Sequence, residues 1–282
     1  MIDPKSVTII VPHLGYTKEE EYALDQCLLS LKETVSDIRV LIAKNGAECN
    51  HENFDVWVKE QDQGMAVNAA VSITDTKWIM VSNSDMIYPP GWWEKLTVDI
   101  EKPIDNPLVS QLKWCISPML IEPRPGAPTF QVQMFGGAGG DFDKEGWLEF
   151  AENWPELKHE VMQIRTGFNL PFLIKRELWD TIQGYDINYR PWGSNADSDL
   201  EYKIRLAGIQ PYQNTNCIVY HFSQSSGTGS PENKPYWEKN WHYFISKWGF
   251  ERASSPTIWE ANFEIPEPPI RKYTPIWEGK YK

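Results

Sequence analysis

The chain has 282 residues, which is long enough to bury a sizeable core in one large domain or two smaller ones. It carries 27 basic and 39 acidic side chains, and the net charge of −12 disfavours nucleic acid or an anionic membrane as the main partner. The four cysteines show no C-x-x-C spacing, so we expect reduced core thiols rather than a zinc or redox site. There is no apolar leader and no apolar run of membrane-spanning length, which predicts a cytoplasmic protein without a transmembrane segment.

The first half alternates strand and helix patterns. Apolar runs predict strands at 7–11, 38–43, 55–59 and 78–81, and apolar spacing predicts helices at 18–34 and 64–74. Pro12 is expected to end the first strand. This order of elements is typical of an α/β fold with a doubly wound, mostly parallel sheet and right-handed crossovers.

The second half has a looser pattern. It predicts strands at 108–112, 130–134, 173–175 and 217–222, and helices at 91–101, 176–182, 199–206 and 236–248. No Gly-Lys-Ser/Thr follows the glycine run at 136–140, so a mobile lid or acceptor loop is favoured over a phosphate cradle. With no repeat or clean linker, we expect one domain over 1–252, with halves 1–113 and 114–252, and a Pro-rich extension at 253–282 packed on it.

The stretch from Lys77 to Pro90 combines a buried strand with polar residues at its carboxyl end. Its apolar run is followed at once by Asn83, Ser84 and Asp85, and then by two prolines that prevent the strand from continuing. Ligands bind at the carboxyl ends of strands in an open α/β sheet, so Asp85 is well placed to hold a divalent metal. The alternative is that Asn83 and Asp85 only shape a turn.

Three further polar residues lie at the ends of predicted elements. Asp197 and Asp199 are at a helix start, where an acid is often only a cap, but two acids at this spacing cannot both cap one helix in the same way. One of them is therefore a candidate general base. A single histidine is more often structural, yet His221, at a strand end before a Ser- and Gly-rich loop, suits a metal site. Asp85 with His221 would suit Mn²⁺ or Mg²⁺, the other positions being filled by substrate phosphate oxygens.

Taken together, these motifs resemble family 2 glycosyltransferases of the GT-A fold. The resemblance spans most of the chain and depends on the order and spacing of several short motifs. They are Ile9-Ile10-Val11-Pro12, Asn45-Gly46, Gln63-Gly64 to Asn68, Asn83-Ser84-Asp85, Gly184-Tyr185-Asp186, Asp197-Ser198-Asp199-Leu200 with Arg205, His221, and Tyr243 to Gly249 with its closing Lys-Trp-Gly.

The resemblance implies a Rossmann-like, mostly parallel central sheet flanked by helices, with a short antiparallel sheet on the acceptor side. It implies inverting transfer of a sugar from a nucleotide-diphospho-sugar donor to an acceptor hydroxyl, with Mn²⁺ or Mg²⁺ held by Asp85 and His221. The general base would be Asp197 or Asp199. The residues implied to line the donor are Pro12, His13, Asn45, Asp62, Asn68, Asn83 and Ser84, and those implied to line the acceptor are Trp192, Gly193 and Ser194 with the 136–143 loop.

Some positions depart from the family pattern. Lys44 replaces the acid that the family places against the nucleotide base, which weakens the inference of a uridine donor, and Ala196 replaces the acid before the base. Two alternatives stay open: a non-catalytic nucleotide-sugar or carbohydrate binding protein, and a sugar nucleotidyltransferase, although Pro12-His13-Leu14-Gly15 lacks the basic glycine-rich loop usual in the latter. The acceptor, whether a glycan, a lipid-linked sugar, a protein or a modified base, and the oligomeric state, for instance a homodimer, are left open.

Overall fold

The computed structural model describes residues 1–46, 51–98, 113–123, 131–132, 135–154, 161–163, 170–191, 193–222 and 233–248. The predicted strand at 108–112 and the extension at 253–282 lie outside the described residues, as do Cys49 and Trp192.

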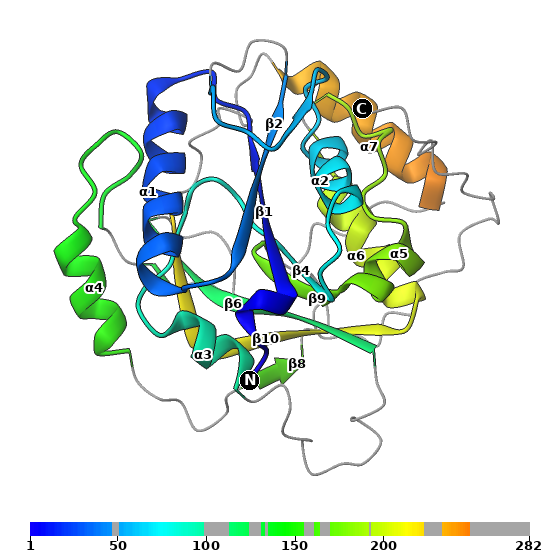
Figure 1. Ribbon diagram of the computed structural model, residues 1–282. Helices are drawn as coiled ribbons and strands as arrows, with labels where there is room; N and C mark the ends of the chain where they lie inside the picture. Colours follow the sequence, from blue (N-terminus) through cyan, green and yellow to red (C-terminus); the bar gives the residue numbers. More distant parts are fainter. Residues whose placement is uncertain are drawn as a thin grey trace.

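One mixed sheet forms the centre of the molecule (Figure 1). Its strands are β1 (Val7–His13), β2 (Arg39–Asn45), β3 (Val56–Val58), β4 (Trp78–Val81), β5 (Met86–Ile87), β6 (Lys113–Glu122), β7 (Gln131–Val132), β8 (Val161–Gln163), β9 (Phe172–Lys175) and β10 (Ile209–His221). They lie in the order β3-β2-β1-β4-β9-β6-β10-β5, with β7 beside β6 and β8 beside β10. Strands β3, β2, β1 and β4 pair in parallel, as do β6 and β10, whereas β9, β5 and β8 pair antiparallel within the same sheet.

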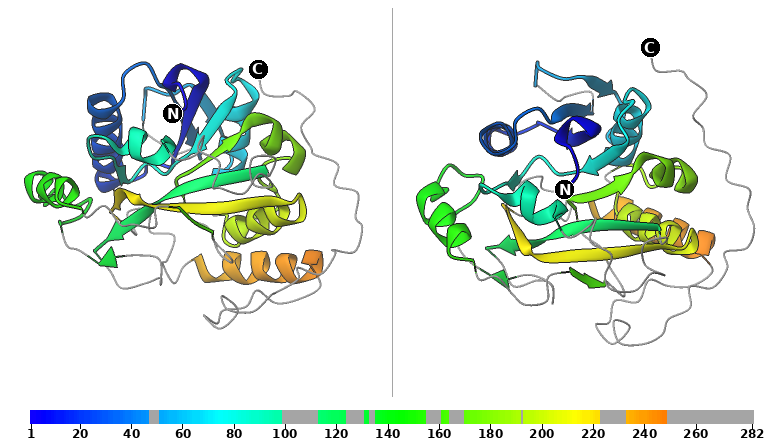
Figure 2. Two further views of the ribbon diagram at one scale, coloured as in Figure 1. Left: turned by 90° about the horizontal axis from the view of Figure 1, so that it is seen from below. Right: turned by 60° about the horizontal axis from the view of Figure 1, so that its bottom comes forward.

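The helices cover the sheet in two groups. They are α1 (Lys18–Thr34), α2 (Gln63–Ser72), α3 (Trp92–Thr97), α4 (Lys144–Glu152), α5 (Arg176–Ile182), α6 (Ala196–Leu206) and α7 (Lys234–Trp248). In Figure 1, α1 and α4 lie on one side of β1, and α2, α5, α6 and α7 lie on the other. Both views in Figure 2 place α7 beside α6, where the Tyr202 ring contacts the rings of Phe244 and Trp248.

Local sequence signals set several of the boundaries. Thr17 and Glu20 form a capping box that starts α1, and this helix has the predicted bounds. Strand β4 and helix α5 also match their predictions. Among the described residues, no helix is both long and apolar enough to span a bilayer.

Other boundaries differ from the predictions. Strand β1 continues through Pro12, which pairs with Ala43 of β2, because a proline removes only one amide donor and leaves the extended backbone intact. Strand β10 starts at Ile209 rather than at 217. Its first part includes buried polar residues whose side chains are hydrogen-bonded. Asn214, for example, donates to the carbonyl oxygen of Lys95 at 2.6 Å. Strand β6, which contains Pro118, was not predicted at all.

Candidate active site

Strand β10 brings Asp85 and His221 together. It pairs antiparallel with β5, with His221 opposite Met86, and the amide of Phe222 donates to the carbonyl oxygen of Asp85 at 3.0 Å. This register places Nε2 of His221 3.3 Å from Oδ2 of Asp85. The two predicted metal ligands, far apart in sequence, are therefore neighbours at the carboxyl ends of β4 and β10.

Glu122 joins this pair from the other neighbour of β10. It ends β6, whose parallel pairing sets Ile121 opposite Tyr220, and its Oε1 lies 2.5 Å from Nδ1 of His221. Sequence reasoning missed Glu122, because β6 was not predicted and no motif marks this residue. A carboxylate on Nδ1 fixes the histidine ring and its tautomer, which leaves Nε2 directed at Asp85.

Two carboxylates flank the His221 ring. Burial alone would lower the pKa of His221, but Asp85 and Glu122 outweigh it and raise the pKa to about 10. Near neutral pH the ring is therefore an imidazolium cation, with a proton on each nitrogen, between two carboxylates. A divalent cation could replace the proton on Nε2. One imidazole and hard carboxylate oxygens are a donor set that fits Mn²⁺ or Mg²⁺.

Residues of the predicted donor site cluster at the ends of β1, β2 and β4. The Asn45 side chain donates to the carbonyl oxygen of His13 at 3.0 Å, and Gln63 donates to the side chain of Asn83 at 3.0 Å. Asp62 caps α2 by accepting from the amide of Met65 at 2.9 Å. Pro12 is buried in β1, and Ser84 is half-buried beside Asn83.

The carboxyl group of Asp62 is buried and only partly hydrogen-bonded. Its side chain is buried, and its Oδ2 has no hydrogen-bond partner among the described residues. Burial raises the pKa of Asp62 to about 6, and Arg190 opposes this shift. The position therefore favours a proton or a ligand donor on Oδ2.

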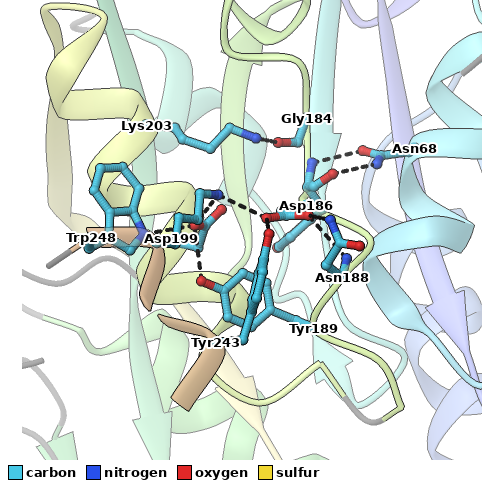
Figure 3. Close-up of polar contacts among 11 residues, drawn as sticks. Asn68, Gly184, Asp186, Asn188, Tyr189, Asp199, Lys203, Tyr243 and Trp248 are labelled. Atoms are coloured by element: carbon cyan, nitrogen blue, oxygen red, sulfur yellow. Dashed lines mark hydrogen bonds and ion pairs between the residues drawn. The ribbon is translucent and has the colours of Figure 1, made fainter. Parts of the chain in front are cut away.

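Asn68 connects the two halves of the chain instead of standing open to a ligand. Its Nδ2 donates to the carbonyl oxygen of Tyr185 at 2.8 Å, and its Oδ1 accepts from the amide of Tyr185 at 2.9 Å. The neighbouring Gly184 has φ +56°, and a Cβ there would lie 2.2 Å from Oδ1 of Asn68. Figure 3 shows the two hydrogen bonds of the Asn68 side chain beside the network around Asp186 and Asp199.

The two aspartates of α6 face different surroundings. Asp199 is fully buried, and its Oδ1 accepts from Tyr189 at 3.1 Å and from the indole of Trp248 at 2.8 Å (Figure 3). Lys247 forms an ion pair with the same oxygen. Asp197 is exposed, and its Oδ1 accepts a hydrogen bond from Tyr185 at 3.1 Å. Both lie in the first turn of α6, and neither is its N-cap, which is Asn195.

Lys247 links Asp199 to a second buried carboxylate, Asp186. Its Nζ lies 2.9 Å from Oδ2 of Asp186, which also accepts from the hydroxyl of Tyr243 at 2.9 Å. Burial would raise the pKa of Asp186, but Lys247 and these hydrogen bonds hold it below its usual range. Burial raises the pKa of Asp199, against the opposing pull of Lys247 and Lys203. This network fixes α7 against α6.

Of the predicted acceptor residues, Gly193 and Ser194 lie just before α6. Gly193 has φ +65° and donates to the carbonyl oxygen of Tyr189 at 3.0 Å, and the hydroxyl of Ser194 accepts from Asn240 of α7 at 3.1 Å. The Gly136 loop is fixed at both ends, because the hydroxyl of Tyr220 donates to the carbonyl oxygen of Gly136 at 2.7 Å and Asp141 accepts from the amide of Gly137 at 3.0 Å.

The same arrangement of sheet and helices occurs in solved structures. The crystal structure of GalNAc-T7 with UDP, GalNAc and Mn²⁺ matches with a TM-score of 0.50 and 14% identity, over 85% of this chain and 49% of that one. The chain has the GT-A fold. It spans about half the length of GalNAc-T7.

Two other solved structures have lower scores. Glucosyl-3-phosphoglycerate synthase from Mycobacterium tuberculosis, in complex with Mg²⁺ and uridine diphosphate, matches at 14% identity and a TM-score of 0.43, over 76% of this chain and 70% of that one. S. aureus TarS matches at 11% identity and a TM-score of 0.47, over 74% of this chain and 36% of that one. No protein-family model and no curated protein sequence matches the chain. The likeness is therefore one of fold.

Proposed function

We propose that this chain is a metal-dependent, inverting glycosyltransferase of the family 2 type, which moves a sugar from a nucleotide-diphospho-sugar to an acceptor hydroxyl. The observation that carries the proposal is the pairing of Asp85 with His221, 3.3 Å apart, at the carboxyl ends of strands in a GT-A sheet. This is the edge at which an open α/β sheet binds its ligands.

Asp85 and His221 are the residues that would hold Mn²⁺ or Mg²⁺. When bound, such a cation neutralises charge that builds on a diphosphate leaving group. With the cation in place of the Nε2 proton, Glu122 would keep the remaining proton of His221 on Nδ1, so that Nε2 offers its lone pair to the ion. Glu122 is thus a positioning residue, which acts through the histidine.

We assign the general base to Asp197. Its carboxylate is exposed and can meet an acceptor hydroxyl, whereas Asp199 is enclosed by Tyr189, Trp248 and Lys247. A base in this role contributes about 10²–10⁴-fold to the rate. The hydrogen bond from Tyr185 holds the carboxylate of Asp197 in one orientation.

The donor would lie against the ends of β1, β2 and β4. Asn45, Asp62 and Asn83 offer polar groups there, beside Pro12, Ser84 and the backbone of His13, whose carbonyl oxygen accepts from Asn45. We assign Asn68 to holding the backbone of Tyr185 in place, because both ends of its amide are engaged. Lys44 lies 4.9 Å from the ring centroid of Phe54 and 5.3 Å from that of Trp57, which gives the nucleotide-base side of the site a cationic and aromatic character.

A donor panel tests the proposal. The protein is incubated with nucleotide-diphospho-sugars of several bases and Mn²⁺, with and without candidate acceptors, and released nucleoside diphosphate is measured. We expect release that depends on the cation and increases with the right acceptor. Asp85→Asn should abolish it.

Other outcomes separate the alternatives. Binding that raises the melting temperature without any nucleoside diphosphate release would indicate a non-catalytic binding protein. Pyrophosphate formation from a sugar phosphate and a nucleoside triphosphate would indicate a nucleotidyltransferase. Unchanged turnover in excess EDTA would remove the metal role of Asp85 and His221.

A further inference from the structure

A second group of metal-ligand side chains shares no residue with the Asp85–His221 pair. His13 ends β1, Glu21 is in the first turns of α1, and His51 belongs to the connection between β2 and β3. Nε2 of His13 lies 3.1 Å from Oε1 of Glu21, and Nδ1 of His51 lies 2.8 Å from Oε2 of the same carboxylate. One ligand atom from each residue lies within 4.8 Å of the other two, and in the described part of the chain no other three such residues are so close.

Hydrogen bonding alone explains this cluster poorly. The side chain of His13 is 0% exposed and that of His51 is 12% exposed. The second ring nitrogens, Nδ1 of His13 and Nε2 of His51, are buried and have no partner among the described residues. A metal ion beside Glu21 would be bound by the other nitrogen of each ring, Nε2 of His13 and Nδ1 of His51, which now share this single carboxylate.

The chemistry of the cluster selects the ligand. Two imidazoles and one carboxylate form a three-residue set that zinc uses when its fourth position is left to water or another small ligand. Burial lowers the pKa of His13 despite the adjacent Glu21, which favours the neutral ring, the form that donates a lone pair to a metal. Imidazole-rich sets suit zinc, whereas the carboxylates around His221 suit Mn²⁺ or Mg²⁺.

We propose that His13, Glu21 and His51 form a zinc site, separate from the catalytic cation site. The ion would join three elements: the end of β1, helix α1 and the β2–β3 connection. Glu21, whose side chain is 32% exposed, provides the open side through which the ion and its fourth ligand enter.

The site would also order the neighbouring surface. Nζ of Lys44 donates to the carbonyl oxygen of His51 at 3.2 Å and lies over the ring of Phe54. Zinc held by His51 would thus fix the backbone against which Lys44 packs. This role does not depend on glycosyl transfer and would persist in a chain without turnover.

Zinc titration of the full chain tests the proposal. After removal of metals with EDTA and exchange into chelator-free buffer, Zn²⁺ binding is measured by calorimetry, and bound zinc by elemental analysis. Two variants weaken the cluster, Glu21→Gln and His51→Ala, and both positions are partly exposed, so folding should survive. His221→Ala removes the other site, and His242→Ala on α7 is a control for loss of an exposed histidine.

We expect His221→Ala and His242→Ala to retain a tight zinc equivalent that raises the melting temperature, and Glu21→Gln and His51→Ala to bind it at least about tenfold more weakly. With Co²⁺ as the probe, the visible absorption of a coordinated ion should persist in His221→Ala and disappear in His51→Ala. Equal zinc affinity in the unaltered chain and in both cluster variants overturns the proposal, as does a chain that takes up no zinc. Metal-free variants that match the unaltered chain in circular dichroism show that lost binding is not lost folding.

Discussion

Asn68 and Tyr185 exchange two hydrogen bonds, of 2.8 and 2.9 Å, between a helix of the first half of the chain and the turn that precedes the candidate base. The hydroxyl of the same tyrosine donates to Asp197. The orientation of Asp197 is therefore coupled to the donor half of the molecule through the buried amide of Asn68.

Asn68→Asp tests this connection. A carboxylate can still accept from the amide of Tyr185 but cannot donate to its carbonyl oxygen, which is left unsatisfied beside a buried charge. We expect a loss of about 1–3 kcal/mol in the free energy of unfolding, measured by urea denaturation. Asn153→Asp is the matched control, because its side chain also donates to a backbone carbonyl oxygen, that of Glu149 at 2.8 Å, but at the exposed end of α4; it should cost less, about 0.5–1 kcal/mol. Equal effects at the two sites would contradict the role given to Asn68.

Asp197→Asn should lower turnover, whereas Asp199→Asn should lower the stability of the fold. The first should lower turnover by about 10²–10⁴-fold and leave the melting temperature and nucleotide binding nearly unchanged, because the amide oxygen can still accept from Tyr185 but the amide cannot take a proton. The second should lower the free energy of unfolding by about 1–3 kcal/mol, since the amide nitrogen that replaces Oδ2 would be a buried donor without an acceptor. Steady-state rates and thermal unfolding on both variants separate the two roles. Retained turnover in Asp197→Asn would refute the assignment of the base.

Glu122→Gln should weaken Mn²⁺ binding by about 10–100-fold while the fold is kept, because the neutral amide orients His221 less firmly and makes Nε2 a poorer donor. Mn²⁺ titration with a nucleoside diphosphate present measures the effect. Glu149→Gln, on the exposed side of α4, should bind Mn²⁺ like the unaltered chain. If the two glutamine variants bind equally well, Glu122 has no part in the cation site.

Asp62 should make stability fall as the pH rises through a defined window. Burial raises its folded-state pKa from 3.8 to about 6, so between these values the folded chain keeps a proton that the unfolded chain loses. Asp62→Asn retains the helix cap and cannot titrate. The stability of this variant relative to the unaltered chain should therefore increase by about 2 kcal/mol between pH 4 and pH 7, and level off above. If the free energies of unfolding of the two proteins changed with pH in the same way, Asp62 would have the same pKa in the folded and unfolded chain.

The sequence by itself determined those elements whose signals are local. The Thr17–Glu20 capping box and the apolar spacing behind it specify α1 to the residue, and the run before Asn83 specifies β4. It also placed Asp85 and His221 at strand ends, because a change from apolar to polar residues at the end of a buried run is visible in the chain itself.

Only the tertiary structure decided which residues of distant strands lie opposite one another. The pairing of β10 with β5 on one side and β6 on the other sets His221 between Asp85 and Glu122, and no local pattern encodes such a register between distant strands. Likewise, Asp197 and Asp199 look equivalent in sequence, and only the packing of α7 against α6 buries one and leaves the other exposed. Burial and charge pairing are properties of surroundings assembled from distant segments, and they alone separate a structural carboxylate from one that can take a proton.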